Sequence, residues 1–137
     1  MIQHNRQQQL VVWVIWGFLL CSVVVYQFAL GGGIPKGTDA PAAGLDPFAV
    51  VAVVEVLIAS AFRWLLLPRA DAPGKILVLM IIGLALSEAA EILGLFLVSP
   101  DQPGTKLALW ILSLLSVIQF IPLYARSTPQ SDPFRTN

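Results

Sequence analysis

Four long apolar runs constrain this chain more than any other feature of its sequence. They cover about residues 10–30, 48–67, 76–98 and 107–124. About 20 apolar residues in a row are enough to cross a lipid bilayer as one α-helix. Only 12% of the 137 residues are charged, whereas a soluble domain has about 25%. We therefore expect an all-α membrane protein with four transmembrane helices and the lipid bilayer as its surroundings.

Helix-breaking residues separate the four runs. The three connections are rich in proline, glycine and aspartate, which favour turns. The second connection is short, so the second and third helices should pack as an antiparallel hairpin, and we expect two such hairpins in all. Residues 1–126 would then form one transmembrane domain, followed by a polar cytoplasmic tail at 127–137.

Basic residues predict the orientation, because lysine and arginine are more frequent in cytoplasmic loops. With four crossings, both termini and the second connection share one side of the membrane. Two basic residues, Lys36 and Lys106, fall on the other side, against six on the terminal side: Arg6, Arg63, Arg69, Lys75, Arg126 and Arg135. We expect both termini in the cytoplasm. The first run is too long for a signal-peptide core, so we expect it to remain as a helix.

Three glutamates lie inside the apolar runs. Glu55 is in the second run, and Glu88 and Glu91 are in the third. Pairing Leu67 with Ile76 across the short turn puts Glu55 level with Glu88, and Glu91 about 4–5 Å further out. An ionised side chain at mid-bilayer costs at least about 2.5–3.5 kcal/mol, so these acids must be protonated, bind a cation or pair with a base. Our ion-binding candidates are Glu88 and Glu55, with Glu91 secondary.

Small and polar residues accompany the acids on the third and fourth helices. The spacing of one set puts four small residues on one face of the third helix, where they would let another helix approach closely: Gly83, Ser87, Ala90 and Gly94. A second set could supply hydrogen bonds to the acids: Ser87, Ser113, Ser116 and Gln119. The first helix offers a weaker polar set near its outer end: Ser22, Tyr26 and Gln27.

Arg63 is the only basic residue inside the second run. It is eight residues from Glu55, or about 12 Å along a helix, so a direct bond is not expected. We expect its side chain to reach the cytoplasmic interface beside Trp64.

The sequence offers few residues for other kinds of site. His4 is the only histidine and Cys21 the only cysteine, so zinc and haem ligands are missing and no metal or cofactor is expected. No phosphate loop or nucleophile elbow is present, and we assign no catalytic residue. The formal net charge of zero and the lack of a basic patch disfavour nucleic acid as a partner. Enzyme activity is the least favoured class.

Residues 85–95, with Glu88 near their centre, resemble the carboxylate helix of the proteolipid (c) subunits of rotary ATPases. That family has an Ala-x-x-Glu-x-x-x-Ile-x-Gly-Leu run whose glutamate carries the translocated proton or sodium ion. The resemblance implies that Glu88 is the ion-binding carboxylate. The chain departs from the family in its second run, 48–67, which has no glycine where the family has a repeated Gly-x-Gly pattern.

Two functions are compatible with this pattern. In the first, the chain is a proton- or cation-binding membrane subunit that uses Glu88 and Glu55. It would act as a homo-oligomer or inside a larger membrane complex, since one small bundle has little room for an aqueous path. In the second, it is a structural or assembly subunit whose neutral glutamates fix the helix register.

Overall fold

The computed structural model describes residues 2–41 and 44–125, and every regular element in that part of the chain is helical. The four α-helices are α1 (Ile2–Ala29), α2 (Pro47–Ala61), α3 (Pro73–Phe96) and α4 (Pro103–Ile118). A π-helical turn, η1 (Phe62–Leu66), and a 3-10 turn, η2 (Leu67–Arg69), continue α2, and a 3-10 turn, η3 (Pro122–Ala125), follows α4. The all-α prediction is confirmed. The predicted tail at 127–137 lies outside the described residues.

Proline and glycine set most of the helix ends. Pro47, Pro73 and Pro103 each stand at the start of a helix, where the missing N–H of proline has no helical acceptor to lose. α1 ends just before three consecutive glycines, of which Gly32 and Gly33 have φ angles of 71° and 100°. Such left-handed backbone is strained for other residues, so the glycine run terminates the helix.

α4 is displaced from the run that predicted it. It begins at Pro103 and ends at Ile118, whereas the apolar run covers 107–124. Pro122 explains the early end, because its nitrogen cannot donate the next helical hydrogen bond. The backbone tightens instead, with Phe120 N donating to Val117 O at 3.1 Å.

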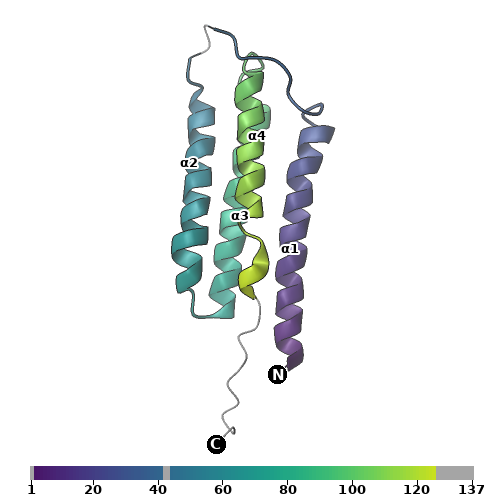
Figure 1. The fold of residues 1–137 in the computed structure, drawn as a ribbon, viewed down its shortest axis with the longest axis vertical. Helices are drawn as coiled ribbons and strands as arrows, with labels where there is room; N and C mark the ends of the chain where they lie inside the picture. The colour runs from purple at the N-terminus through teal and green to yellow at the C-terminus, as the bar shows by residue number, and fades with distance from the viewer. Residues whose placement is uncertain (1, 42–43, 126–137) are drawn as a thin grey trace, which may run out of the picture.

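The helices lie side by side, and neighbours in the chain run in opposite directions (Figure 1). α3 packs against all three other helices, and α4 contacts α1, α2 and α3 as well. The described parts of the 30–46 connection (30–41 and 44–46) and the connection 97–102 lie at one end of the bundle, which we call the loop end. The α2–α3 connection and the N-terminus lie at the other, the terminal end.

The small residues of α3 form the contact face for α4. All four, Gly83, Ser87, Ala90 and Gly94, are buried. The Phe120 ring lies directly against Gly83, and a methyl group at Gly94 would lie 3.1 Å from the Leu109 Cβ. The stripe therefore lets α3 and α4 approach closely, as the spacing predicted.

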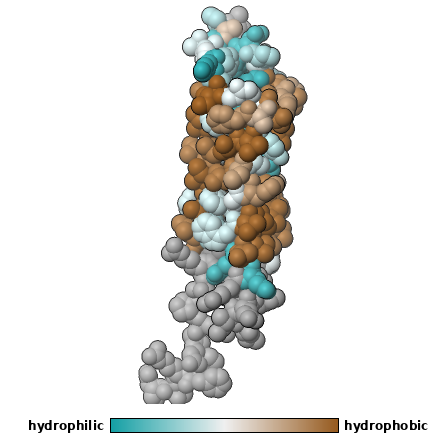
Figure 2. All heavy atoms as spheres, turned by 90° about the vertical axis from the view of Figure 1, so that its right-hand side faces the viewer, coloured by the Kyte–Doolittle hydropathy of each residue, from teal (hydrophilic) through white to brown (hydrophobic). Residues whose placement is uncertain are grey.

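The outer surface of the bundle is apolar along most of its length. Large apolar side chains point outward from the helices, for example Phe18 (70% exposed) and Leu57 (64% exposed). On the face seen in Figure 2, hydrophobic residues cover the middle and hydrophilic ones gather toward the ends. Within the described residues, three helical segments are long and apolar enough to cross a membrane, Gln9–Ala29, Pro47–Arg69 and Gly74–Phe96, while α4 is shorter.

The Gly83 contact gives a direct test of this packing. A Gly83→Ala substitution puts a methyl group into the Phe120 ring and should lower the free energy of unfolding by about 1–3 kcal/mol, as overpacking does. The matched control is Gly17→Ala in α1, where a Cβ meets no atom within 4 Å. Thermal unfolding in detergent, followed by circular dichroism, compares the two; equal transition temperatures would contradict the α3–α4 contact.

Candidate functional site

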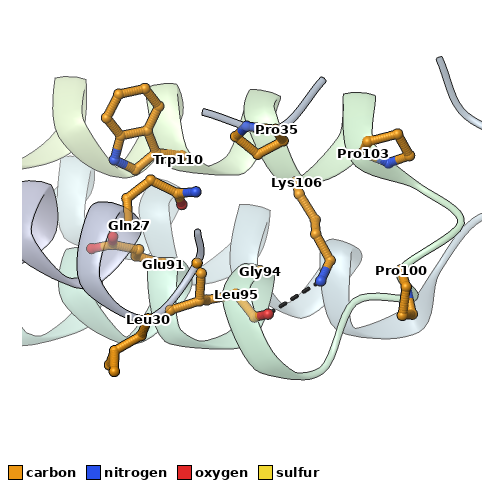
Figure 3. A pocket seen from close by; sticks show the side chains of 11 residues that line it. Gln27, Leu30, Pro35, Glu91, Gly94, Leu95, Pro100, Pro103, Lys106 and Trp110 are labelled. Carbon is orange, nitrogen blue, oxygen red and sulfur yellow. Dashed lines mark hydrogen bonds between the residues drawn. The ribbon is translucent and has the colours of Figure 1, made fainter. Parts of the chain in front are cut away.

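A pocket of about 240 Å³ lies near the loop end of the bundle (Figure 3). Its walls come from the segments that meet at this end: the last turn of α1, the C-terminal part of α3, the start of α4 and the two connections. Most of the lining is apolar or proline. The polar side chains are Gln27, Glu91, Lys106 and Trp110.

Glu91 is the most buried acid that the structure describes. Its side chain is 2% exposed, and neither of its oxygens has a hydrogen-bond partner in the described part of the chain. The indole nitrogen of Trp110 is also buried and has no acceptor there. An unsatisfied buried polar atom typically costs about 1–3 kcal/mol, and native proteins have few of them. Two acceptors and one donor thus lie beside the pocket without a partner and with almost no accessible surface.

The other polar side chains of the pocket already have partners. Gln27 donates its Nε2 to the carbonyl of Gly33. Lys106 donates its Nζ to the carbonyl of Leu95 at 3.2 Å, near the C-terminus of α3. Figure 3 shows the Lys106 amine directed toward this carbonyl and away from Glu91.

Glu88 lies almost one turn before Glu91 on α3 and is close enough to interact with it electrostatically. Its Oε1 accepts a hydrogen bond from the Ser22 hydroxyl of α1 at 2.7 Å. The same hydroxyl lies 2.8 Å from the carbonyl of Leu19. A serine has one proton to donate, so it cannot make two full hydrogen bonds as a donor.

Glu55 lies on α2, whereas Glu88 and Glu91 lie on α3. It is half-buried on α2, and its Oε2 has no hydrogen-bond partner among the described residues. The hydrogen bond of Glu88 goes to α1 instead of α2. The predicted pairing of Glu55 with Glu88 at one depth therefore stays a prediction, while Glu88 and Glu91 lie together on α3.

Three of the four predicted supporting residues form a hydrogen-bonded network. The hydroxyls of Ser87 and Ser116 are 2.6 Å apart, and Gln119 donates its Nε2 toward Ser116 at 3.2 Å and Ser60 at 3.1 Å. The fourth, Ser113, is buried with no partner for its hydroxyl in the described part of the chain. The network links α3, α4 and α2 through hydroxyl and amide groups, whereas the sequence had suggested bonds to the acids.

Gln119 also receives two contacts from η1. Arg63 donates its Nε to the backbone carbonyl of Gln119 at 2.6 Å, and Trp64 donates its Nε1 to the side-chain oxygen at 3.0 Å. The Arg63 guanidinium lies 4.8 Å from the centre of the Trp64 ring. Arg63 thus lies beside Trp64 and ties η1 to the end of α4, while its reach to a cytoplasmic interface stays a prediction.

Two aspartates fasten the 30–46 connection across the loop end. Asp39 accepts hydrogen bonds from the Thr105 hydroxyl (2.6 Å) and from the backbone nitrogens of Gly104 (2.7 Å) and Thr105 (3.2 Å), so it caps α4. Asp46 accepts from Phe48 N at 2.9 Å, which caps α2, and from Ser99 N at 3.1 Å. These bonds hold the connection beside the pocket.

Sequence reasoning missed most of the pocket. A tryptophan toward the end of an apolar run, such as Trp110, is expected from the sequence to be an interface anchor. Gln27 belongs to a weaker polar set, and Lys106 serves only to predict orientation. All three residues lie near the loop end of α1 or α4. Gln27 is far from the other two in the chain, so the sequence alone does not show that they line one cavity with Glu91.

Comparisons with known proteins give no further assignment. No protein-family model, curated protein or solved structure matches the chain. The site is therefore interpreted from the geometry and chemistry of its own residues.

The Asp39 cap predicts a pH-dependent stability. The hydrogen bond from the Thr105 hydroxyl holds the pKa of Asp39 below its usual value of 3.8. A lowered folded-state pKa stabilises the protein above the unfolded-state pKa, and this stabilisation is lost as the pH falls through the folded-state pKa. Wild type should therefore melt at a higher temperature than Asp39→Asn near pH 7. This difference in melting temperature should narrow below about pH 4.

The matched control for this measurement is Asp101→Asn, in the neighbouring connection. Asp101 is exposed, and its substitution should leave the melting temperature close to that of wild type throughout. If the difference in melting temperature between wild type and Asp39→Asn stays constant from neutral to acid pH, the Asp39 carboxylate does not cap α4 as described.

Proposed function

We propose that this chain is an integral membrane protein with four crossings in two antiparallel hairpins, in which Glu91 and Glu88 bind a proton or another small cation. Three long apolar segments and the exposed apolar surface between hydrophilic ends support the membrane placement. α4 is about 24 Å long at 1.5 Å per residue, and η3 extends this segment toward the terminal end. We take α4 and η3 together as the fourth crossing.

The charge distribution supports the orientation expected from the sequence. Arg69 and Lys75 flank the α2–α3 connection at the terminal end, which we assign to the cytoplasm. The loop end, with the pocket, then faces outward. An ion would reach Glu91 from that side.

The observation that carries the proposal is the burial of Glu91 with both oxygens unpaired. Leaving an ionised carboxylate in such surroundings is costly, and more so within hydrocarbon. A bound proton or cation removes that cost. The pocket lies beside Glu91 and extends toward the loop end.

Ser22 supports a proton on Glu88 as one form of the site. If Glu88 is ionised, the single Ser22 proton serves either Leu19 O or Glu88, and one short contact goes without a proton. If Glu88 is protonated, its O–H donates to Ser22 while Ser22 donates to Leu19 O. Both short oxygen–oxygen distances, from Ser22 to Leu19 and from Ser22 to Glu88, then correspond to hydrogen bonds.

The proposal changes which glutamate is taken as the primary ion-binding group. The resemblance to proteolipid subunits assigns the ion to Glu88, whereas the pocket favours Glu91 as the primary group with Glu88 beside it. Glu55 remains a third candidate because one of its oxygens is buried without a partner.

Toward the terminal end, fully buried Met80, Leu84 and Phe120 fill the bundle. The pocket therefore approaches Glu91 from one side only, and passage of an ion through the membrane would need a second copy or a larger complex. We propose such an assembly as the working form.

A structural or assembly subunit is the second candidate. The bonds from Ser22 to Glu88 and between Ser87 and Ser116 support it, because contacts of this kind fix how helices are aligned. In this case Glu91 would bind nothing that exchanges with solvent.

Carbodiimide modification separates the two candidates, because the reagent attacks protonated carboxyl groups. In vesicles, we expect a mass adduct on Glu91 whose formation slows when the pH is raised or when a bound cation competes. Glu91→Gln should remove this adduct, while the matched Glu55→Gln should retain it. A folded sample in which Glu91 does not react, or reacts regardless of pH and cations, would favour the structural role.

A further inference from the structure

We propose that α2 carries a docking surface for the transmembrane helix of a partner protein, a helix with a lysine or arginine side chain at the depth of Glu55. The inference rests on the membrane placement in the proposed function, but it does not depend on ion binding at Glu91. It follows from a carboxyl group that can be reached from outside the bundle and from the apolar side chains that lie on either side of it.

The carboxyl group of Glu55 is accessible through one of its two oxygens. The side chain is half-buried on α2. Its Oε2 is enclosed and has no hydrogen-bond partner in residues 2–41 and 44–125, whereas Oε1 is not enclosed and is not bonded there either. A donor placed against this side of α2 can therefore form a hydrogen bond with Oε1.

Glu55 lies within a row of exposed apolar side chains on α2. Phe48, Val51 and Ile58 are 43%, 47% and 43% exposed. Together with Glu55 they follow one another at intervals of three, four and three residues. This spacing puts side chains along one side of a helix, and it is the spacing that packs against a neighbouring helix. We call these four residues the Glu55 stripe.

The bundle leaves the Glu55 stripe open on its outer side. α2 lies at the edge of the described bundle, where it packs against α3 and α4 but not against α1 (Figure 1). Lipid tails can cover the apolar side chains of the stripe, but they have no hydrogen-bond donor for a carboxyl oxygen. An acid in hydrocarbon is costly without such a donor. The donor for Glu55 therefore has to come from another protein helix.

Charge complementarity specifies the chemistry of that helix. A carboxylate forms its strongest hydrogen bonds with the cationic group of a lysine or an arginine. A second copy of this chain in the same orientation presents no such group at the level of Glu55. Of its eight basic residues, only Arg63 lies inside an apolar run. Arg63 is about 12 Å further toward the terminal end, and its Nε donates to the Gln119 carbonyl. The partner is therefore a different protein.

Binding of synthetic transmembrane peptides to the full chain in phosphatidylcholine vesicles tests this inference. One peptide is a leucine–alanine helix with a single central lysine, and its match has an uncharged norleucine at that position. A dansyl group on each peptide accepts energy from the tryptophans of the chain, so energy transfer reports binding. We expect the lysine peptide to bind wild type about tenfold more tightly, the value of one hydrogen bond to a charged group. Glu55→Met, which keeps the length of the side chain but removes the acceptor, should abolish this preference.

The matched control is Glu88→Met, because Glu88 already accepts a hydrogen bond from Ser22; it should leave the preference unchanged. Equal affinities for the two peptides in wild type, or a preference that survives in Glu55→Met or is lost in Glu88→Met, would overturn the inference. Energy transfer between copies labelled at the exposed Cys21 that Glu55→Met abolishes would overturn it as well, because a second copy would then cover the stripe. Carbodiimide modification of Glu91 is measured without peptides, so failure of the docking surface is distinguishable from failure of the proposed function.

Discussion

A carboxylate enclosed by packed side chains must be neutralised where it lies, and the rest of this structure is arranged around that requirement. Glu91 is buried with neither oxygen bonded in the part of the chain described. The other elements close around it: α1 brings Ser22 to the neighbouring Glu88 and Gln27 to the pocket, and α4 brings Trp110. Asp39 then fastens the long connection to the start of α4. The result is a pocket with four polar side chains in its wall, near one end of the bundle.

Close approach of α3 and α4 is what makes the pocket compatible with a well-packed bundle. Phe120 lies on Gly83 and Leu109 on Gly94, with a bonded pair of serines between them. Of these contacts, the one at Gly83 and the serine pair lie between the acids and the terminal end, so packed side chains separate the acids from that side. The same arrangement leaves the space beside Glu91 near the loop end, where the polypeptide connections form part of its walls.

Much of the fold could be predicted from the sequence, because the length of an apolar run and the position of proline act locally. The all-α class and the stripe of small residues on α3 follow from such patterns. The end of α4 differs from the prediction because Pro122 stops a helix inside a run that is still apolar. The start of α1 at Ile2 also differs, because hydropathy alone does not mark where a helix begins among polar residues.

The site could be predicted only in part. A glutamate in an apolar run is conspicuous, so all three acids were found. Which of them has a partner depends on how α1 and α4 pack against α3, and periodicity within one helix does not fix this. Ser22 and Glu88 are 66 residues apart in the chain, and the Asp39 cap reaches α4 across 65 residues. Trp110 has no local feature that distinguishes a pocket residue from an interface anchor.

The most direct test of the account is the side from which the buried acid can be reached. Glu91→Cys, made in a Cys21→Ala background to remove the exposed native thiol, can be reconstituted in vesicles and treated with a small membrane-impermeant thiol reagent on either face. The account predicts reaction from the face that carries Lys36 and the 30–46 connection, and none from the face that carries the α2–α3 connection. Reaction from the opposite face, or from neither, would contradict it.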